Sequence, residues 1–133
     1  MRQIVRVPFL ATAPLLVIQC FVWRGNGMGV LRMAVDTGSS FVIIKPEILL
    51  TLGYDLTAAP PMTIYGIHAQ ALTAPQVTLE RFGVIGAEEA NVDCLALSLP
   101  PQVGLDGLVG LSYLQRFSLV TFNFSDNSLT LQR

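Results

Sequence analysis

Charged side chains are scarce in this sequence. Only 13% of its 133 residues are Asp, Glu, Lys or Arg, against about 25% in a typical soluble domain, and the formal net charge is −1. No cluster of Lys and Arg supplies a basic surface, so we expect no nucleic-acid partner. Because hydrophobic residues make up 52% of the chain, part of its surface should be apolar, which favours a protein partner.

The chain also lacks an apolar run long enough to cross a membrane, which requires about 20 residues. The nearest candidate, Phe9 to Val22, is interrupted by Thr12, Pro14 and Gln19. The first residues loosely resemble a signal peptide, but no convincing cleavage site of small residues follows. We therefore predict no membrane span and expect a cytoplasmic protein, although a chain of this length could also be one domain cut from a longer, anchored protein.

Cysteine and histidine are rare. Cys20 and Cys94 lie far apart in segments that both read as strands, and no Cys-x-x-Cys pair is present. Two buried thiols are a better interpretation than a disulfide or a metal site. His68 is the only histidine, whereas zinc normally needs three or four ligands. We therefore expect no metal and no organic cofactor.

Short β-rich runs separated by turn residues dominate the sequence. The predicted strands are Leu15–Trp23, Met28–Val35, Phe41–Ile44, Thr63–Ile67, Gln70–Leu79, Asn91–Leu97, Ser118–Phe124 and Ser128–Leu131. Only Pro46–Leu52 and Leu111–Arg116 read as helices. This pattern predicts an all-β domain, closed like a barrel or packed as a sandwich. No repeat or linker divides residues 1–133, so we expect a single domain, with residues 1–14 as an N-terminal segment that could be peripheral.

One acidic residue stands in an unusual place. The sequence Asp36-Thr37-Gly38-Ser39-Ser40 forms the turn between two apolar strands, where aspartate is normally depleted. Such an Asp either hydrogen-bonds its own turn or is a functional group held by a rigid loop. The motif alone does not decide between these interpretations, because short motif matches often arise by chance.

A second motif favours the functional interpretation. Leu105-Asp106-Gly107-Leu108-Val109-Gly110 lies about seventy residues downstream and precedes the predicted helix from Leu111. Together, in this order, the two motifs resemble those of the retropepsin-like aspartic peptidases, and the likeness is greater to the bacterial and Gag-type branch than to the viral one. The resemblance implies a closed, barrel-like retropepsin fold with one or two short helices. It also implies that Leu108, Val109 and Gly110 pack beneath the Asp36 loop.

The resemblance further implies an endopeptidase that needs two copies of the chain. Water attack on a peptide bond requires two carboxylates that share a proton, and the chain offers one Asp-Thr-Gly. Asp36 would face Asp36 of a partner in a homodimer. Thr37 would brace the two loops, Gly38 would allow a tight backbone, and Ser39 could hydrogen-bond the carboxylate of Asp36. Asp106 lacks the following Thr-Gly and is interpreted as a turn residue.

Two further segments receive predicted roles, one from the resemblance and one from its sequence pattern. The residues Tyr65, Gly66, Ile67 and His68 fall where the family places its flap, a hairpin that closes over an extended peptide substrate. The strand Ser128–Leu131 is a plausible dimer contact, because a chain end with alternating apolar residues can pair across a twofold axis. A noncatalytic module that uses the same fold for dimerisation or peptide binding remains the alternative function.

Overall fold

The computed structural model describes residues 3–10, 14–65 and 71–133, and it is almost entirely β-structure. Its strands are β1 (Ile4–Pro8), β2 (Val17–Arg24), β3 (Gly27–Val35), β4 (Val42–Ile44), β5 (Pro61–Tyr65), β6 (Ala71–Gly83), β7 (Glu89–Ala96), β8 (Gly107–Val109), β9 (Leu119–Asn123) and β10 (Ser128–Gln132). The helices are α1 (Pro46–Leu52), the single 3₁₀ turn η1 (Pro101–Val103) and α2 (Leu111–Leu114).

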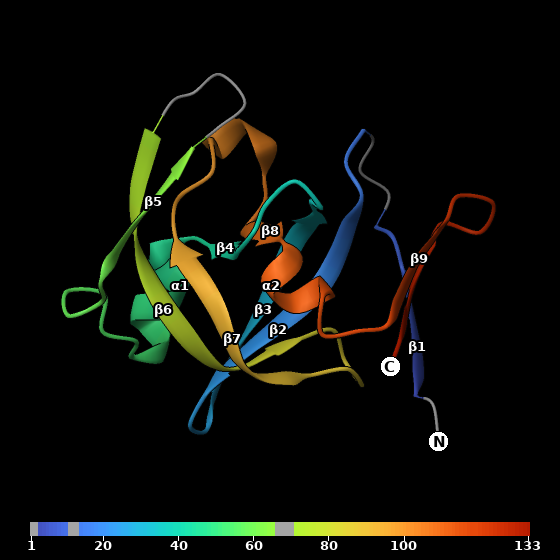
Figure 1. Ribbon diagram of the computed structural model, residues 1–133, viewed down its shortest axis with the longest axis horizontal. Coiled ribbons are helices and arrows are strands. Elements are labelled where there is room, and N and C mark those ends of the chain that lie inside the picture. The colour runs from blue at the N-terminus through green and yellow to red at the C-terminus, as the bar shows by residue number, and fades with distance from the viewer. Residues whose placement is uncertain (1–2, 11–13, 66–70) are drawn as a thin grey trace.

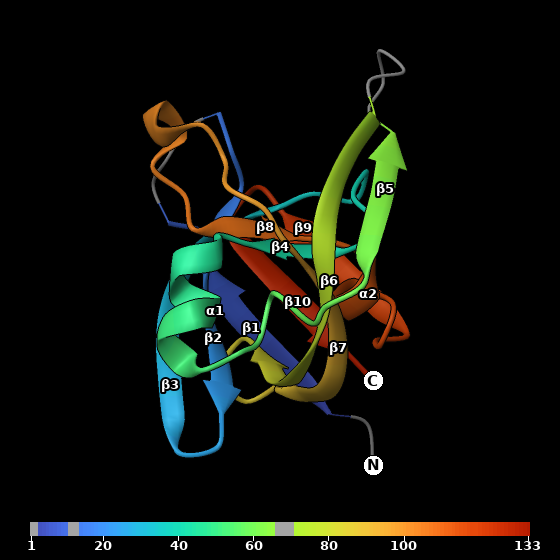
Figure 2. The same ribbon diagram turned by 90° about the vertical axis from the view of Figure 1, so that its left-hand side faces the viewer.

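Six of these strands form a closed barrel, as predicted (Figure 1). They are hydrogen-bonded in the order β2-β3-β8-β4-β7-β6, and pairing of β6 with β2 closes the ring, with Val22 opposite Phe82. The long strand β6 continues beyond the barrel and pairs with β5, so this hairpin projects from the barrel beside β4 and β7 (Figure 2). The predicted strands and helices are all present, with ends that shift by a few residues.

A second sheet of three strands, in the order β1-β10-β9, packs against the barrel (Figures 1 and 2). The segment 1–14, set apart in the sequence analysis, contributes β1 to this sheet. Leu129 and Leu131 of β10 are fully buried in the same core cluster as the barrel side chains. Because both edges of β10 are paired within the chain, the predicted interface role of Ser128–Leu131 is wrong: no edge of that strand is left for a partner.

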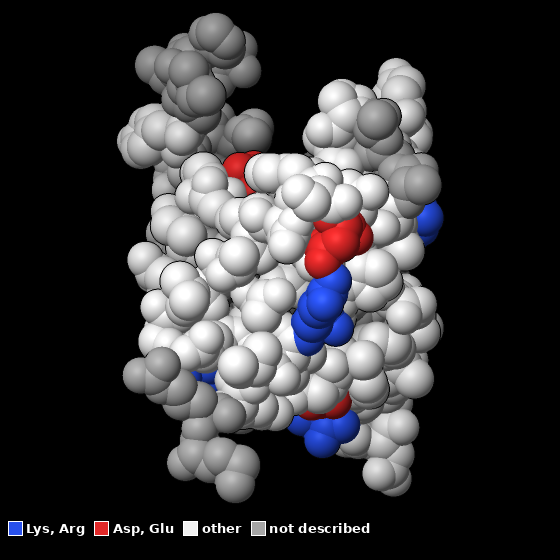
Figure 3. All heavy atoms as spheres, turned by 90° about the vertical axis from the view of Figure 1, so that its right-hand side faces the viewer, with Lys and Arg blue, Asp and Glu red and all other residues white. Residues whose placement is uncertain are grey.

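Few charged side chains interrupt the surface. The face shown in Figure 3, on the side where β1 and β9 lie in Figure 1, is mostly uncharged. The ion pairs that do occur often connect separate elements: Arg133 pairs with Glu89 and so ties the end of the chain to β7. No helix among the described residues is long and apolar enough to cross a membrane.

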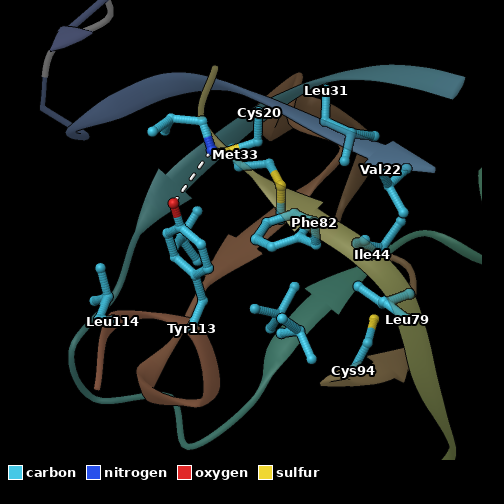
Figure 4. Close-up of a cluster of buried hydrophobic side chains, with 14 of the residues drawn as sticks. Cys20, Val22, Leu31, Met33, Ile44, Leu79, Phe82, Cys94, Tyr113 and Leu114 are labelled. Carbon is cyan, nitrogen blue, oxygen red and sulfur yellow. Dashed lines mark hydrogen bonds between the residues drawn. The ribbon is translucent and has the colours of Figure 1, made fainter. Parts of the chain in front are cut away.

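The barrel interior is filled by side chains from its strands and from α2. Alternation along β2 places Ile18, Cys20 and Val22 inside, each with no exposed surface. Phe82 meets the ring of Tyr113 edge-on at 5.2 Å between centroids (Figure 4). Both cysteines are free and buried, as expected, and burial raises the pKa of each thiol.

One polar group in this core connects three segments. The hydroxyl of Tyr113 donates to the carbonyl of Ala87 at 2.8 Å and accepts the backbone N–H of Val84 at 3.3 Å. Burial raises the pKa of Tyr113, so the hydroxyl keeps its proton and donates throughout the ordinary pH range. It therefore anchors the turn after β6 to α2.

Replacing Tyr113 with Phe should lower the free energy of unfolding by about 1–3 kcal/mol, because a buried N–H and a buried C=O each lose their partner. Urea unfolding followed by tryptophan fluorescence measures this change. Tyr65→Phe is the matched control, since that ring is 75% exposed, and its effect should be within about 0.5 kcal/mol. Equal effects of the two substitutions would contradict the anchoring role of the Tyr113 hydroxyl.

Candidate active site

Asp36 sits in the loop that joins β3 to β4, directly above β8. The short strand β8 lies between these two strands, parallel to β3 and antiparallel to β4. The backbone N–H of Asp36 donates to the carbonyl of Val109 at 2.9 Å. The two sequence motifs are therefore brought together, and Gly110 lies directly against the carbonyls of Ser39 and Phe41 in the loop.

The side chain of Asp36 is half-buried and held by its own loop. Its Oδ1 accepts the backbone N–H of Gly38 at 2.9 Å. The expected hydrogen bond from Ser39 is not formed, because the tight loop brings the carbonyl of Phe41 to the Ser39 hydroxyl, which donates to it at 2.7 Å. Thr37 and Gly38 are exposed at the surface of the loop.

The start of α2 holds the loop from below. The N–H groups of Leu111 and Ser112 donate to the carbonyls of Ser39 and Ser40 at 2.8 and 2.9 Å. The Ser112 hydroxyl accepts the N–H of Val42 at 2.8 Å and donates to the carbonyl of Asp93 at 2.7 Å. The sequence analysis gave no role to Ser112. Its position just after the second motif was the one feature of the sequence that could have pointed to a role near the Asp36 loop.

Two glycines make the close approach of these segments possible. A Cβ atom on Gly107 would lie 1.8 Å from the carbonyl oxygen of Ile43. A Cβ atom on Gly110 would lie 2.2 Å from the carbonyl oxygen of Phe41 and 2.6 Å from that of Ser39. Since these neighbours are backbone atoms, neither can rotate away, and both positions require glycine.

Asp106, the other acid in the two motifs, has a structural role. Its Oδ1 forms an ion pair with Lys45 Nζ at 2.8 Å, and its Oδ2 accepts the N–H of Arg32 at 2.8 Å. Its backbone also pairs with both of these residues. The hydrogen bond to Asp106 raises the pKa of Lys45. Asp106 thus fastens β3 to the start of α1, consistent with its interpretation as a non-catalytic residue.

A cavity of about 470 Å³ opens between the Asp36 loop and the β5–β6 hairpin. Among the described residues that line it, Asp36 supplies the only ionisable group apart from the phenol of Tyr65, which stands at the end of β5. One wall is apolar and formed by Phe41, Ile43, Ile64, Leu95 and Leu108. The β5–β6 hairpin therefore contributes Thr63, Ile64 and Tyr65 to the lining of this cavity. Of the predicted flap residues, Gly66, Ile67 and His68 lie outside the described residues.

The described residues contain no group of three or more His, Cys, Asp and Glu side chains that could hold a metal ion. The site instead consists of one carboxylate, backbone donors and hydroxyl groups beside an apolar wall. A half-buried carboxylate of this kind can accept a proton from water or donate one to a carbonyl oxygen.

Known proteins share these features. Residues 23–113, which include both motifs and the hairpin, match a family described as aspartyl protease. The crystal structure of a retropepsin-like aspartic protease from Rickettsia conorii is 25% identical in sequence, with a TM-score of 0.71. The match covers 99% of this chain and 92% of that one. No curated protein sequence matches the chain at a significant level.

Replacing Gly110 with Ala should displace the Asp36 loop and lower the free energy of unfolding by about 3 kcal/mol or more, because the added methyl group meets two backbone carbonyls. Thermal and urea unfolding measure the loss. Gly104→Ala is the control: its φ of +68° carries a strain of about 1–2 kcal/mol, but no atom lies within 4 Å of the new Cβ. If Gly110→Ala proved no more costly than Gly104→Ala, the tight packing of the second motif beneath the loop would be refuted.

Proposed function

Because the chain belongs to the aspartyl protease family and has a retropepsin-like fold, we propose that it is an aspartic endopeptidase whose active site is completed by a second copy of the chain. One observation carries the proposal. A single loop-held carboxylate, Asp36, faces a substrate-sized cavity, with a hairpin on the other side of that cavity. One carboxylate is half of what metal-free hydrolysis by this family requires.

The chemistry follows from two Asp36 side chains close together. At a separation of about 3 Å, like charges cannot both ionise, so the pair holds one proton. The ionised carboxylate takes a proton from a water molecule, which attacks the peptide carbonyl, while the protonated carboxyl donates to the carbonyl oxygen. The bond from Gly38 N–H fixes one oxygen of Asp36 and leaves the other for this exchange.

The loop and cavity suggest how the partner and the substrate bind. The exposed hydroxyl of Thr37 is available to brace the loop of the second copy, as the family resemblance implies. An extended peptide would add its backbone to the hairpin edge at β5, and apolar side chains would fit the wall formed with Ile43 and Leu108. The buried, free thiols of Cys20 and Cys94 are compatible with a reducing, cytoplasmic setting.

A noncatalytic peptide-binding module would use the same cavity but would not need Asp36 as an acid. We expect Asp36→Asn to abolish cleavage of a denatured protein mixture at every pH tested, because Asn cannot share or accept the proton. The control is Asp55→Asn: Asp55 is exposed, and its contacts to Thr57 and Ala58 use an oxygen that Asn retains. Cleavage that persists in the Asp36 variant would exclude the proposed mechanism.

Proton sharing makes a further prediction for a tethered dimer, in which two copies are joined in one chain and only one Asp36 is changed to Asn. Because the two carboxylates act as a unit, this protein should be nearly inactive and not half-active. The unmodified tethered protein should show an activity optimum that falls on both sides as pH changes, since only the singly protonated pair is competent. A half-active tethered variant would show that each Asp36 works alone.

A further inference from the structure

The outer edge of β3 is only partly covered by other strands. On one side β3 pairs with β2 along most of its length. On the other side β8 pairs only with Met33–Val35. Asp106 extends this contact by one residue, since it hydrogen-bonds to both the N–H and the C=O of Arg32. From Arg32 back to the start of β3, no described strand lies beside this edge.

Met28 and Val30 direct their backbone groups to this uncovered side of β3. The N–H and C=O groups of alternate residues in a strand point to the same side. Since Arg32 directs its own groups to Asp106, those of Val30 and Met28, which occupy the preceding alternate positions, point the same way. Among the described residues they have no hydrogen-bond partner there. The edge therefore offers two N–H and two C=O groups to an added strand.

An apolar groove runs along the same edge, between β3 and α1, which packs beside the strand (Figure 2). Its volume is about 370 Å³, and its apolar lining comes from Met28 and Val30 on β3 and from Ile48 and Leu52 on α1. The side chains of Met28 and Val30 are 49% and 53% exposed. An extended peptide that adds to a sheet uses this combination, because its backbone pairs with the edge while alternate side chains enter the groove.

The charges at the groove indicate which peptide fits it. Its charged lining residues are Lys45 and Glu47. Lys45 is already paired with Asp106, at 2.8 Å between Nζ and Oδ1. The carboxylate of Glu47 is exposed and forms no ion pair with any residue in the described part of the chain. The groove thus carries one negative charge without an ion-pair partner, and a Lys or Arg of the peptide complements it.

The groove is separate from the Asp36 cavity. The two share no lining residue. Asp36 follows the far end of β3, and the stretch from Val30 to Asp36 corresponds to about 20 Å of extended chain. A peptide in the groove therefore leaves the cavity open.

We propose that the groove between β3 and α1 is a second peptide-binding site, which takes an extended, apolar segment of another protein with a Lys or Arg beside Glu47. The segment pairs its backbone with Met28 and Val30 and places alternate side chains against Ile48 and Leu52. The site goes beyond the proposed peptidase activity and does not require it. In a peptidase, it would hold a substrate protein at a point remote from the cleaved bond.

A synthetic peptide tests the backbone pairing. The probe is a fluorophore-labelled Lys-Thr-Val-Thr-Val-Thr-Lys peptide, whose valines share one face of a strand. Its binding to the Asp36→Asn protein, which should not cleave it, is followed by fluorescence anisotropy. N-methylation of the valines and N-methylation of the threonines remove donors from opposite edges of the peptide. One of the two should weaken binding at least about tenfold, and the other should leave it within a few-fold. Equal effects, or none, would exclude pairing with one edge.

A proline on the protein side tests where the probe binds. Val30→Pro removes the outward N–H of Val30, which β2 does not use, and should weaken probe binding at least about tenfold. Val30→Thr keeps that N–H and should bind the probe within a few-fold of the unmodified protein. Thermal unfolding shows whether each variant is folded, and the N-methylated probes test the same edge without any change to the protein.

A reversed charge tests the preference for a basic segment. Glu47→Lys should weaken binding of the lysine probe at least about threefold and strengthen binding of the same peptide with Glu in place of both Lys. Glu88→Lys makes the same change in net charge outside the groove and should alter neither affinity by more than about twofold. The proposal is overturned if the lysine probe does not bind at about 1 mM, if folded Val30→Pro binds it like the unmodified protein, or if the two charge variants behave alike.

Discussion

The threading of β8 between β3 and β4 is the constraint on which the rest of the structure depends. The three strands approach so closely that no side chain fits at Gly107 or Gly110, where a Cβ atom would lie within 2.2 Å of a backbone oxygen. This packing closes one side of the barrel and fixes both ends of the Asp36 loop. The position of the carboxylate is thereby set by backbone contacts and not by neighbouring charges.

The aspartates of the two motifs, Asp36 and Asp106, differ in how their charges are used. Asp106 is matched by Lys45 and by the N–H of Arg32, so its charge is used in joining elements. Asp36 accepts a hydrogen bond from one backbone N–H, that of Gly38, and forms no ion pair with any of the described residues. Asp36 also lines the cavity with the apolar wall, where its carboxylate is accessible to a bound molecule.

Much of this arrangement is visible in the sequence, because alternating apolar residues and the two spaced motifs specify strands and their order. What escaped prediction depends on contacts between distant segments. The strand β8 has only three residues, the first of them Gly107, and Gly110 follows it, which is too little for a periodic signal; β1 is defined by its pairing with β10. The hydrogen-bond acceptor of the Ser39 hydroxyl and the two hydrogen bonds of the Ser112 hydroxyl follow from loop geometry, which secondary-structure propensities do not encode.

The location of the C-terminal strand changes how assembly relates to folding. A chain end that waited for a partner strand would leave Leu129 and Leu131 exposed in the separate copy, and folding would then require association. Here β1 and β9 cover β10 on both sides, and both leucines are buried within one chain. The core is complete before a second copy arrives, so a partner adds little to folding. In the proposed enzyme a partner would add the second carboxylate, so catalysis would be controlled by the concentration of the chain, separately from its stability.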